Sequence, residues 1–230
     1  MGKIITIYHG SEKIIENPVY GEGKRNNDFG VGFYCTESVS LAKEWAVTSL
    51  RDGFANRYSL DTEYLKILDL NSPNYTILNW IAVLVENRLL SLKTPVSRRA
   101  RRYLIDNFSI NVNAFDLIIG YRADDSYFDY AEAFLNNSIT VEQLAKAMQL
   151  GKLGEQIVLK SQYAFSLLRF EGFEIAKKEE FYNKRKSRND SANQMYLEIL
   201  EEESEGLYIQ DIIKGGIQND DPRVPRNIFK

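Results

Sequence analysis

Cysteine and histidine are almost absent from this 230-residue chain, which contains one of each. The single Cys35 excludes an internal disulfide, and no set of cysteines and histidines with metal-ligand spacing is present, so the sequence predicts no metal site. The sequence also lacks an apolar run long enough to cross a bilayer, and its N-terminus lacks a basic region followed by a long apolar segment. We therefore expect a cytoplasmic protein without membrane contact.

Neither sign of charge is in large excess. The 29 lysines and arginines against 32 aspartates and glutamates give a net charge of −3, which provides no overall electrostatic attraction to nucleic acid. Hydrophobic residues make up 44% and charged residues 27%, as in ordinary globular proteins. The length suits one substantial domain, or a domain with an extension.

The most informative stretch runs from Asn27 to Thr36 and contains two glycines that alternate with bulky residues. Glycine inside a strand-like run indicates a bulge, or a place where another group approaches the backbone closely. Strand alternation would put Gly32, Tyr34 and Thr36 on one face, so that an aromatic ring stands beside bare backbone. Such a face suits a flat ligand, although a glycine-kinked core strand with a packed tyrosine would give the same pattern.

A first strand is predicted upstream, over Lys3 to Gly10, because this segment is rich in β-branched residues. It ends on the only histidine, His9, beside Tyr8 and Gly10. A lone histidine on a strand often has a structural role. At a strand end, however, side chains open into clefts, so His9 is also a candidate site residue.

The segment Tyr8-His9-Gly10, followed by Asn27-Asp28-Phe29-Gly30-x-Gly32-Phe33-Tyr34-x-Thr36, resembles the first two motifs of ADP-ribosyltransferases of the His–Tyr–Glu class. Diphtheria toxin and the poly(ADP-ribose) polymerases share this class. More narrowly, residues 3 to about 170 are similar to a bacterial family of unassigned function in that superfamily. The resemblance implies an α+β fold, with a split antiparallel β core, flanking helices and NAD as substrate in the cleft between the halves.

The resemblance also implies roles for single residues. His9 would hold the ribose hydroxyls, and the ring of Tyr34 would stack on nicotinamide, where cation–π attraction is worth on the order of 1–2 kcal/mol. The implied catalytic residues are His9, Tyr34, Gln156 and Glu155. The implied cofactor-binding residues are Tyr8, His9, Gly10, Phe29, Gly30, Gly32, Phe33, Tyr34 and Thr36.

The third motif departs from the class. Its glutamate begins a strand of the form Glu-x-Ile/Val-x, and the matching run Gln156 to Leu159 has glutamine there, with Glu155 one residue out of register. Glutamine can hydrogen-bond a ribose hydroxyl but cannot act as a base. Three readings remain open: a bulge brings Glu155 into the site, Asp124 or Asp125 supplies the charge, or the acceptor is a phosphate or nucleic-acid base that needs no activation.

A continuous apolar run, Phe115 to Gly120, predicts a central strand. Polar residues at the end of such a strand commonly face a site, so we expect Arg122, Asp124 and Asp125 to contact the substrate. The alternative is that one of the two aspartates caps the helix that follows.

Other segments have clear local signals. We expect a helix after Ser38 or Ser40, a strand pair over 56–60 and 65–70, a helix beginning at Ser72-Pro73, and a capping box at Thr140 to Gln143. The arginines in the run Arg98 to Arg102 read either as a solvated helix surface or as a phosphate-contacting patch. We expect a transferase domain over residues 1–170 and a mainly helical extension over 171–230 packed on it.

The favoured function is NAD-dependent ADP-ribosyl transfer to a protein or nucleic-acid acceptor. The resemblance also implies a toxin role, which in some relatives a small antitoxin protein keeps silent. Two other functions remain open. A non-catalytic NAD or ADP-ribose binding module would explain the missing glutamate. An RNA 2′-phosphotransferase-like enzyme shares the superfamily but usually relies on several basic residues and histidines around the phosphate, and this chain has one histidine.

Overall fold

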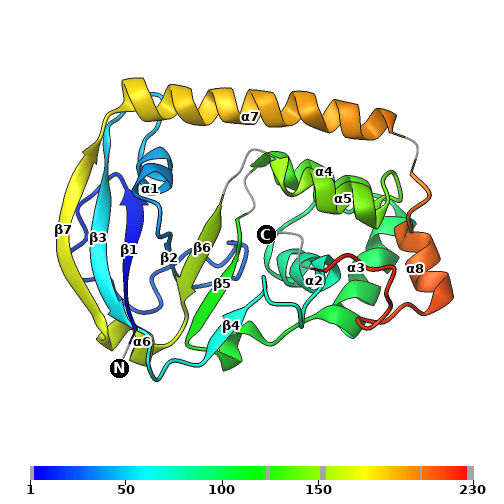
Figure 1. The fold of residues 1–230 in the computed structure, drawn as a ribbon, viewed down its shortest axis with the longest axis horizontal. Helices are drawn as coiled ribbons and strands as arrows, with labels where there is room; N and C mark the ends of the chain where they lie inside the picture. The colour runs from blue at the N-terminus through cyan, green and yellow to red at the C-terminus, as the bar shows by residue number, and fades with distance from the viewer. Residues whose placement is uncertain (1–2, 123–124, 151–153, 203, 227–230) are drawn as a thin grey trace.

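The computed structural model describes residues 3–122, 125–150, 154–202 and 204–226. Two β-sheets lie side by side, and helices cover the outer side of the second sheet (Figure 1). The expected α+β class is therefore confirmed.

The first sheet has the order β1-β3-β7 and is antiparallel throughout. Its strands are β1 (Ile4–Ser11), β3 (Gly53–Asp61) and β7 (Leu168–Ala176). Helix α1 (Val39–Ala46) packs on β1 and β3 and begins at the predicted cap Ser38, whose hydroxyl accepts from the N–H of Leu41 at 3.3 Å. A Cβ at Gly10 would lie 2.1 Å from the Ala42 carbonyl oxygen, so glycine lets α1 lie this close to β1.

The second sheet has the order β2-β6-β5-β4. Its strands are β2 (Phe33–Cys35), β6 (Glu155–Leu159), β5 (Leu117–Tyr121) and β4 (Ile67–Asp69). Strands β4 and β5 are parallel, contrary to the expected antiparallel core, whereas the other pairs are antiparallel. The chain passes through helices between β4 and β5, and such a crossover returns the second strand in the same direction.

The predicted strand pair over 56–60 and 65–70 is wrong, because β3 and β4 lie in different sheets. Strand β3 pairs instead with β1 and β7, which are distant in sequence. Helix α2 (Ile77–Asn87) also begins later than predicted. Its capping box joins Thr76 and Asn79, whose Oδ1 accepts from the Thr76 N–H at 2.9 Å, and this box sets the helix start instead of Ser72-Pro73.

Side chains alternate between the two faces of β6, so this strand contributes to two separate hydrophobic cores. Ile157 and Leu159 face the first sheet, in a core shared with Ile7 and Tyr58. Val158 faces the helical side and belongs to a larger core built around α2.

Around α2 lie α3 (Pro95–Phe108), the 3-10 turn η1 (Val112–Ala114), α4 (Asp125–Leu135), α5 (Val141–Ala147) and α8 (Ile209–Gly215). The short helix α6 (Gln162–Ser166) joins β6 to β7. The predicted capping box of α5 is present, with Thr140 and Gln143 bonded reciprocally.

Two backbone hydrogen bonds join the sheets directly. The N–H of Tyr8 donates to the carbonyl of Thr36 at 2.8 Å, and the N–H of Thr36 donates back at 3.0 Å. This bridge sets β1 beside β2 and so brings the two predicted motifs together.

Helix α7 (Lys178–Glu201) runs along both halves of the molecule, from β7 and α1 to α8 (Figure 1). The expected boundary at residue 170 falls inside β7, which completes the first sheet. Residues 171–176 therefore belong structurally to the N-terminal half, and the mainly helical part begins after them.

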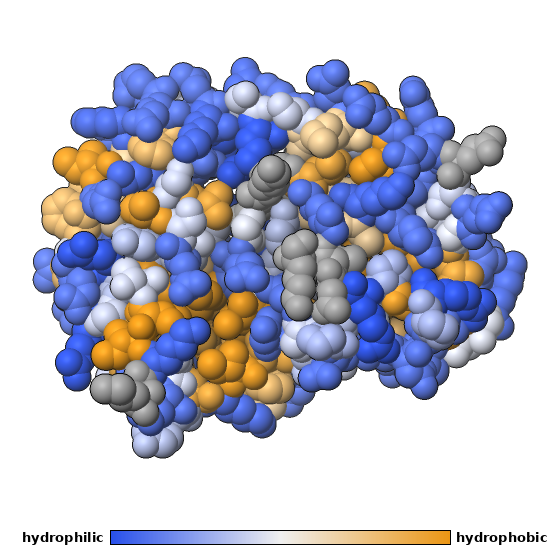
Figure 2. Space-filling model, viewed as in Figure 1, coloured by the Kyte–Doolittle hydropathy of each residue, from blue (hydrophilic) through white to orange (hydrophobic). Residues whose placement is uncertain are grey.

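No described helix is both long and apolar enough to span a membrane. On the face in Figure 2, the surface along α7 is hydrophilic, whereas hydrophobic residues gather over the lower ends of the two sheets.

Candidate functional site

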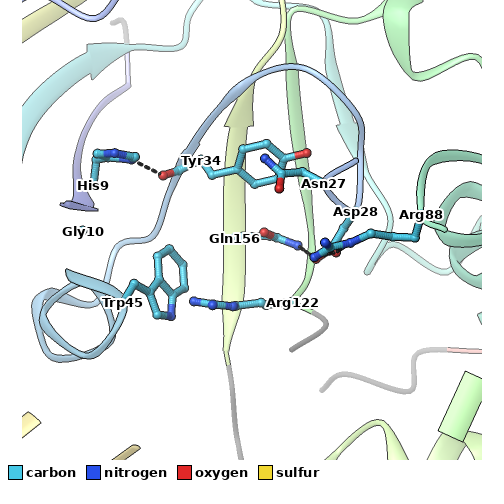
Figure 3. Close-up of a pocket in the computed structure, with 9 residues that line it drawn as sticks. All are labelled: His9, Gly10, Asn27, Asp28, Tyr34, Trp45, Arg88, Arg122 and Gln156. Carbon is cyan, nitrogen blue, oxygen red and sulfur yellow. Dashed lines mark hydrogen bonds and ion pairs between the residues drawn. The ribbon is translucent and has the colours of Figure 1, made fainter. Parts of the chain in front are cut away.

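The two motifs meet at a cavity of about 160 Å³. Strands β1, β2 and β6, helix α1 and the loop before β2 supply most of its wall (Figure 3). The lining residues are His9, Gly10, Asn27, Asp28, Tyr34, Trp45, Arg88, Arg122 and Gln156. A neighbouring groove of about 570 Å³ shares His9, Gly10, Asn27, Tyr34 and Arg122, and extends along residues 15–24. Together they form one continuous recess of mixed polarity.

The imidazole of His9 is held in one orientation. Its Nδ1 lies 2.7 Å from the Tyr34 carbonyl oxygen, and its ring stacks on Phe33 with centroids 4.3 Å apart. A carbonyl can only accept, so Nδ1 carries the proton and Nε2 is the acceptor in the neutral ring. Burial lowers the pKa of His9, although the Tyr34 carbonyl partly opposes this effect. A neutral imidazole with an accepting Nε2 is suited to bind a hydroxyl.

The ring of Tyr34 stands in the cavity wall while its hydroxyl holds the preceding loop. The hydroxyl donates to the Gly30 carbonyl at 2.7 Å and accepts from the Phe29 N–H at 3.0 Å. Burial, and then the nearby Asp28 carboxylate, raise the pKa of Tyr34 well above its ordinary value. The phenol is therefore neutral, and the ring is the part of this side chain that can contact a ligand.

The glycines of the second motif are required by the protein's own packing. Gly30 has a φ of +71°, which favours glycine, and a Cβ at Gly32 would lie 2.6 Å from a methyl of Val158. The expected close approach to the backbone therefore exists, but the approaching groups come from β6 and α2. A ligand is not needed to explain these two positions.

Asp28 and Gln156, which are buried, form a polar cluster with the partly buried Arg88 beside the cavity (Figure 3). Asp28 is 3% exposed, and its Oδ1 accepts from Nε and Nη2 of Arg88, each at 2.8 Å. Its Oδ2 accepts from Nε2 of Gln156 at 2.7 Å. The amide nitrogen of Gln156 also donates to the Tyr121 carbonyl at 3.3 Å. Because only the amide nitrogen can donate to a carboxylate, this network turns the Gln156 oxygen toward the space between Tyr34 and Trp45.

The regular pairing of β6 with β5 places Gln156 and Glu155, the two candidates of the third motif, on opposite faces of the strand. Gly120 pairs with Gln156 and Tyr121 with Glu155, without a register shift. Gln156 is buried on the cavity side, whereas Glu155 is exposed and accepts from Nδ2 of Asn71 at 2.6 Å. Although the residue as a whole is exposed, partial burial of its carboxyl group, and then the charges of Asp69 and Glu37, raise the pKa of Glu155. The bulge that would bring Glu155 into the site is absent from this described strand.

Arg122 and Trp45 close the opposite side of the cavity. The guanidinium carbon of Arg122 lies 4.2 Å from the Trp45 ring centroid, which is cation–π geometry. Arg122 follows β5, as the sequence predicted for a residue near the site. Asp124, and the side chain of Asp125, lie outside the part of the chain that the structure describes.

Several predicted cofactor-binding residues do not line the cavity. Phe29 is 1% exposed and belongs to the core around α2, because its ring packs over Gly120. Thr36 is buried in the inter-sheet bridge, where its hydroxyl accepts from the Ser38 N–H at 3.2 Å. Tyr8 contributes to the same bridge through its backbone, and Phe33 supports His9 while lining the neighbouring groove.

Four lining residues were not predicted: Asn27, Asp28, Trp45 and Arg88. Asn27 and Asp28 begin the second motif and lie close to Gly30 in the sequence, so they could have been predicted as lining residues. The sequence pattern places Trp45 on the apolar face of its helix, which is typical of a core residue. Arg88 is 60 residues from Asp28, and nothing local in the sequence indicates their pairing.

Lys160 anchors the loop before β2. Its Nζ donates to the carbonyls of Phe29 at 2.7 Å and Val31 at 2.6 Å. Burial lowers its pKa from 10.5 to about 8. Within the described residues, no group of three or more histidine, cysteine, aspartate or glutamate side chains is arranged to hold a metal ion.

Comparisons with known proteins identify the family but no activity. No curated protein and no solved structure matches the chain. Residues 5–170 match the family described as "Protein of unknown function (DUF3990)". That match covers well over half of the 230 residues and includes every residue that lines the cavity. The chain belongs to the DUF3990 family.

Proposed function

We propose that the protein is an NAD-dependent ADP-ribosyltransferase with the split-core fold typical of that class. The observation that carries the proposal is the joint geometry of His9, Tyr34 and Gln156. These residues come from three separate strands, match the three motif positions and line one cavity. The hydrogen bond from His9 to the Tyr34 carbonyl fixes the first two relative to each other.

The recess suits a dinucleotide in size and polarity. Ligand pockets commonly measure 300–1,000 Å³, and the groove of about 570 Å³ opens onto the smaller polar cavity. Nε2 of His9 and Oε1 of Gln156 would accept hydrogen bonds from ribose hydroxyls. The ring of Tyr34 would bind the flat, cationic nicotinamide by stacking.

The chemistry requires negative charge near the ribose, because cleavage of a glycosidic bond passes through an oxocarbenium-like transition state. Gln156 carries no charge, but its amide nitrogen is bonded to the Asp28 carboxylate. That carboxylate polarises the amide and leaves its oxygen a stronger acceptor. Arg88 balances part of the charge. Asp28 is thus a positioning residue that acts through Gln156.

The test compares two neighbours on β6. Gln156→Ala should reduce release of nicotinamide from NAD by roughly tenfold or more, equivalent to about 1.4 kcal/mol, while the matched control Glu155→Ala should stay close to the unmodified rate. Calorimetry on both variants reports NAD binding separately. If the unmodified protein neither binds NAD nor releases nicotinamide, the proposal is wrong.

One observation favours a second function. The motif position that carries glutamate in the class holds Gln156, and Glu155 points to the other side of the strand. A non-catalytic NAD or ADP-ribose binding module needs no such charge. NAD binding in the calorimeter without nicotinamide release would select this alternative.

A further inference from the structure

A second recess lies next to the cavity of the candidate site. It measures about 590 Å³ and runs between α3 and the segment that joins α2 to α3. We call it the arginine groove; its lining residues are Arg88, Leu89, Leu90, Leu92, Arg98, Arg101, Arg102, Ile105 and Asp106. Arg88 lines both this groove and the cavity, so the two recesses adjoin at that side chain.

The charge in the groove comes from one face of α3. Arg98, Arg101 and Arg102 have spacings of three and four residues, which place them on the same side of a helix. Arg99 points elsewhere and lines a different pocket beside α8. The arginine run is therefore divided, and three of its four members face the groove.

Backbone carbonyls hold two of these arginines in place. Nη1 of Arg98 donates to the Lys93 carbonyl at 3.0 Å, and Nε of Arg101 donates to the Val85 carbonyl at 2.9 Å. A carbonyl orients a guanidinium without neutralising it. Among the described residues, no carboxylate forms an ion pair with Arg98, Arg101 or Arg102.

The groove therefore carries excess positive charge beside apolar surface. Among the described lining residues, the three arginines on α3 face a single acidic residue, Asp106, and Leu89 beside them is 85% exposed. Guanidinium groups bind phosphate through paired N–H groups, and neighbouring apolar side chains strengthen that attraction by excluding water. None of the described residues that line the groove is aromatic, so these residues offer contacts to a phosphate backbone but no platform for stacked bases.

We propose that the arginine groove binds the phosphates of a nucleic-acid strand, and that the terminal phosphate monoester of this strand is the acceptor. The inference rests on the proposed function. It accounts for a site without a free carboxylate base among its described residues. Asp28 accepts hydrogen bonds from Arg88 and Gln156, and Glu155 faces away from the cavity. An acceptor hydroxyl would need a base, whereas a phosphate monoester is already ionised.

The transfer step requires no removal of a proton from the acceptor. The bond between the ribose C1′ of NAD and the nicotinamide nitrogen breaks, and its electron pair neutralises the pyridinium. A phosphate oxygen donates an electron pair to C1′ and forms the new C–O bond. The phosphate loses one negative charge, and neutral nicotinamide leaves.

The binding test uses fluorescein-labelled single-stranded 12-mers, RNA and DNA, with and without a 5′ or 3′ phosphate. The double variant Arg98→Gln/Arg102→Gln should weaken binding by roughly tenfold and lower the slope of log affinity against log salt by about 1.4, or 0.7 for each phosphate contact. The charge-matched control Arg99→Gln/Arg169→Gln, at exposed positions outside the groove, should bind like the unmodified protein.

The transfer test uses NAD labelled in its adenylate part. Label should appear on phosphorylated 12-mers and not on the same strands with hydroxyl ends, and the groove variant should lose this transfer while the control retains it. Slow nicotinamide release to water, measured without acceptor, reports the proposed function on its own.

Three outcomes overturn the inference while leaving the proposed function intact. One is nicotinamide release with no binding of any 12-mer at 100 mM salt. Another is equal loss of binding in the groove variant and in its control. The third is tight binding of a leucine-containing acidic peptide that no 12-mer displaces, which would make the groove a protein-docking surface.

Discussion

Single residues in the site have partners that fix their orientation. Nδ1 of His9 is fixed by a carbonyl, the hydroxyl of Tyr34 holds two loop backbone groups, and Asp28 accepts from two side chains. Burial favours neutral His9 and neutral Tyr34, although the carbonyl at Nδ1 of His9 and the Phe29 N–H at the Tyr34 hydroxyl partly oppose it. The charge in the cavity therefore comes from Asp28, Arg88 and Arg122.

The lowered pKa of His9 predicts a pH effect on stability. In the unfolded chain His9 titrates near its ordinary value of 6.5, and in the folded protein it titrates lower. Between these values the unfolded chain binds more protons, so the free energy of unfolding should fall as the pH drops below about 6.5. Above that pH the contribution is complete.

Urea denaturation at several pH values checks this effect. The His9→Gln variant should lose the part of the pH dependence that lies below 6.5, and the difference between the two curves isolates His9 from the carboxylates. Parallel curves for both proteins would show that His9 titrates normally in the folded state.

At the residue scale, the resemblance to the three motifs predicted His9, Tyr34 and Gln156 as a group, and the three residues line one cavity. The sequence did not allow prediction of what the glycines do. Gly10 and Gly32 admit neighbouring backbone and side chains of the protein itself, and local sequence cannot distinguish such packing from space for a ligand. Phe29 shows the same limit, because a buried aromatic and a ligand-facing one look alike in sequence.

The element that shapes the cavity is the loop before β2. It carries Asn27 and Asp28 into the wall, and its conformation depends on Gly30 at positive φ, on the Tyr34 hydroxyl and on Lys160. Lys160 directly follows β6, so the strand that supplies Gln156 also anchors this loop.

Lys160→Met tests the anchor. Methionine keeps much of the chain length but donates no hydrogen bond, so the carbonyls of Phe29 and Val31 lose a charged donor, each such bond contributing about 1.5–3 kcal/mol. Removing a buried ammonium whose pKa is already lowered offsets part of this loss. We expect a modest decrease in melting temperature and roughly tenfold weaker NAD binding.

Lys66→Met provides the control, because Lys66 is exposed and lies over Phe115, away from the cavity. Calorimetry with NAD on both variants makes the comparison. Unchanged affinity in a folded Lys160→Met protein would mean that the loop holds its shape without this lysine.

Elements were predicted best where a cap or an apolar run marked them. Ser38 and Thr140 begin their helices as expected, and β5 and β6 follow their apolar runs. The pairing of strands was not predictable in the same way. Strand β3 joins two partners that lie far away in the sequence, and β4 pairs in parallel with β5 although helices separate the two strands in the sequence, so both arrangements depend on tertiary packing.

At the scale of the whole molecule, α7 connects the two halves. Its N-terminal part contacts α1, where Lys184 donates to Ser40 at 2.9 Å and Arg188 pairs with Glu44 at 2.5 Å. Its C-terminal part contacts the helical half, where the Ile199 carbonyl accepts from Gln143 at 3.0 Å. Residues beyond 170, where the family match ends, therefore support the helix that carries Trp45.

The pair of Arg188 and Glu44 gives the last prediction. Glu44 is 2% exposed; burial raises its pKa, and Arg188 is the first of the cations that oppose this rise. Arg188→Met should leave a buried carboxylate without its nearest cation and cost about 3 kcal/mol in the free energy of unfolding. The double variant Glu44→Gln/Arg188→Met removes the stranded charge and should recover most of that loss.

Urea denaturation and nicotinamide release should be measured together on the single and double variants. Because Trp45 follows Glu44 on α1 and lines the cavity, α7 should affect the site only through the position of α1. The double variant should then regain activity along with stability. Restored stability without restored nicotinamide release would contradict this mechanism. It would mean that the charge of Glu44 or Arg188 acts on the site directly, by its electrostatic interaction with Arg122.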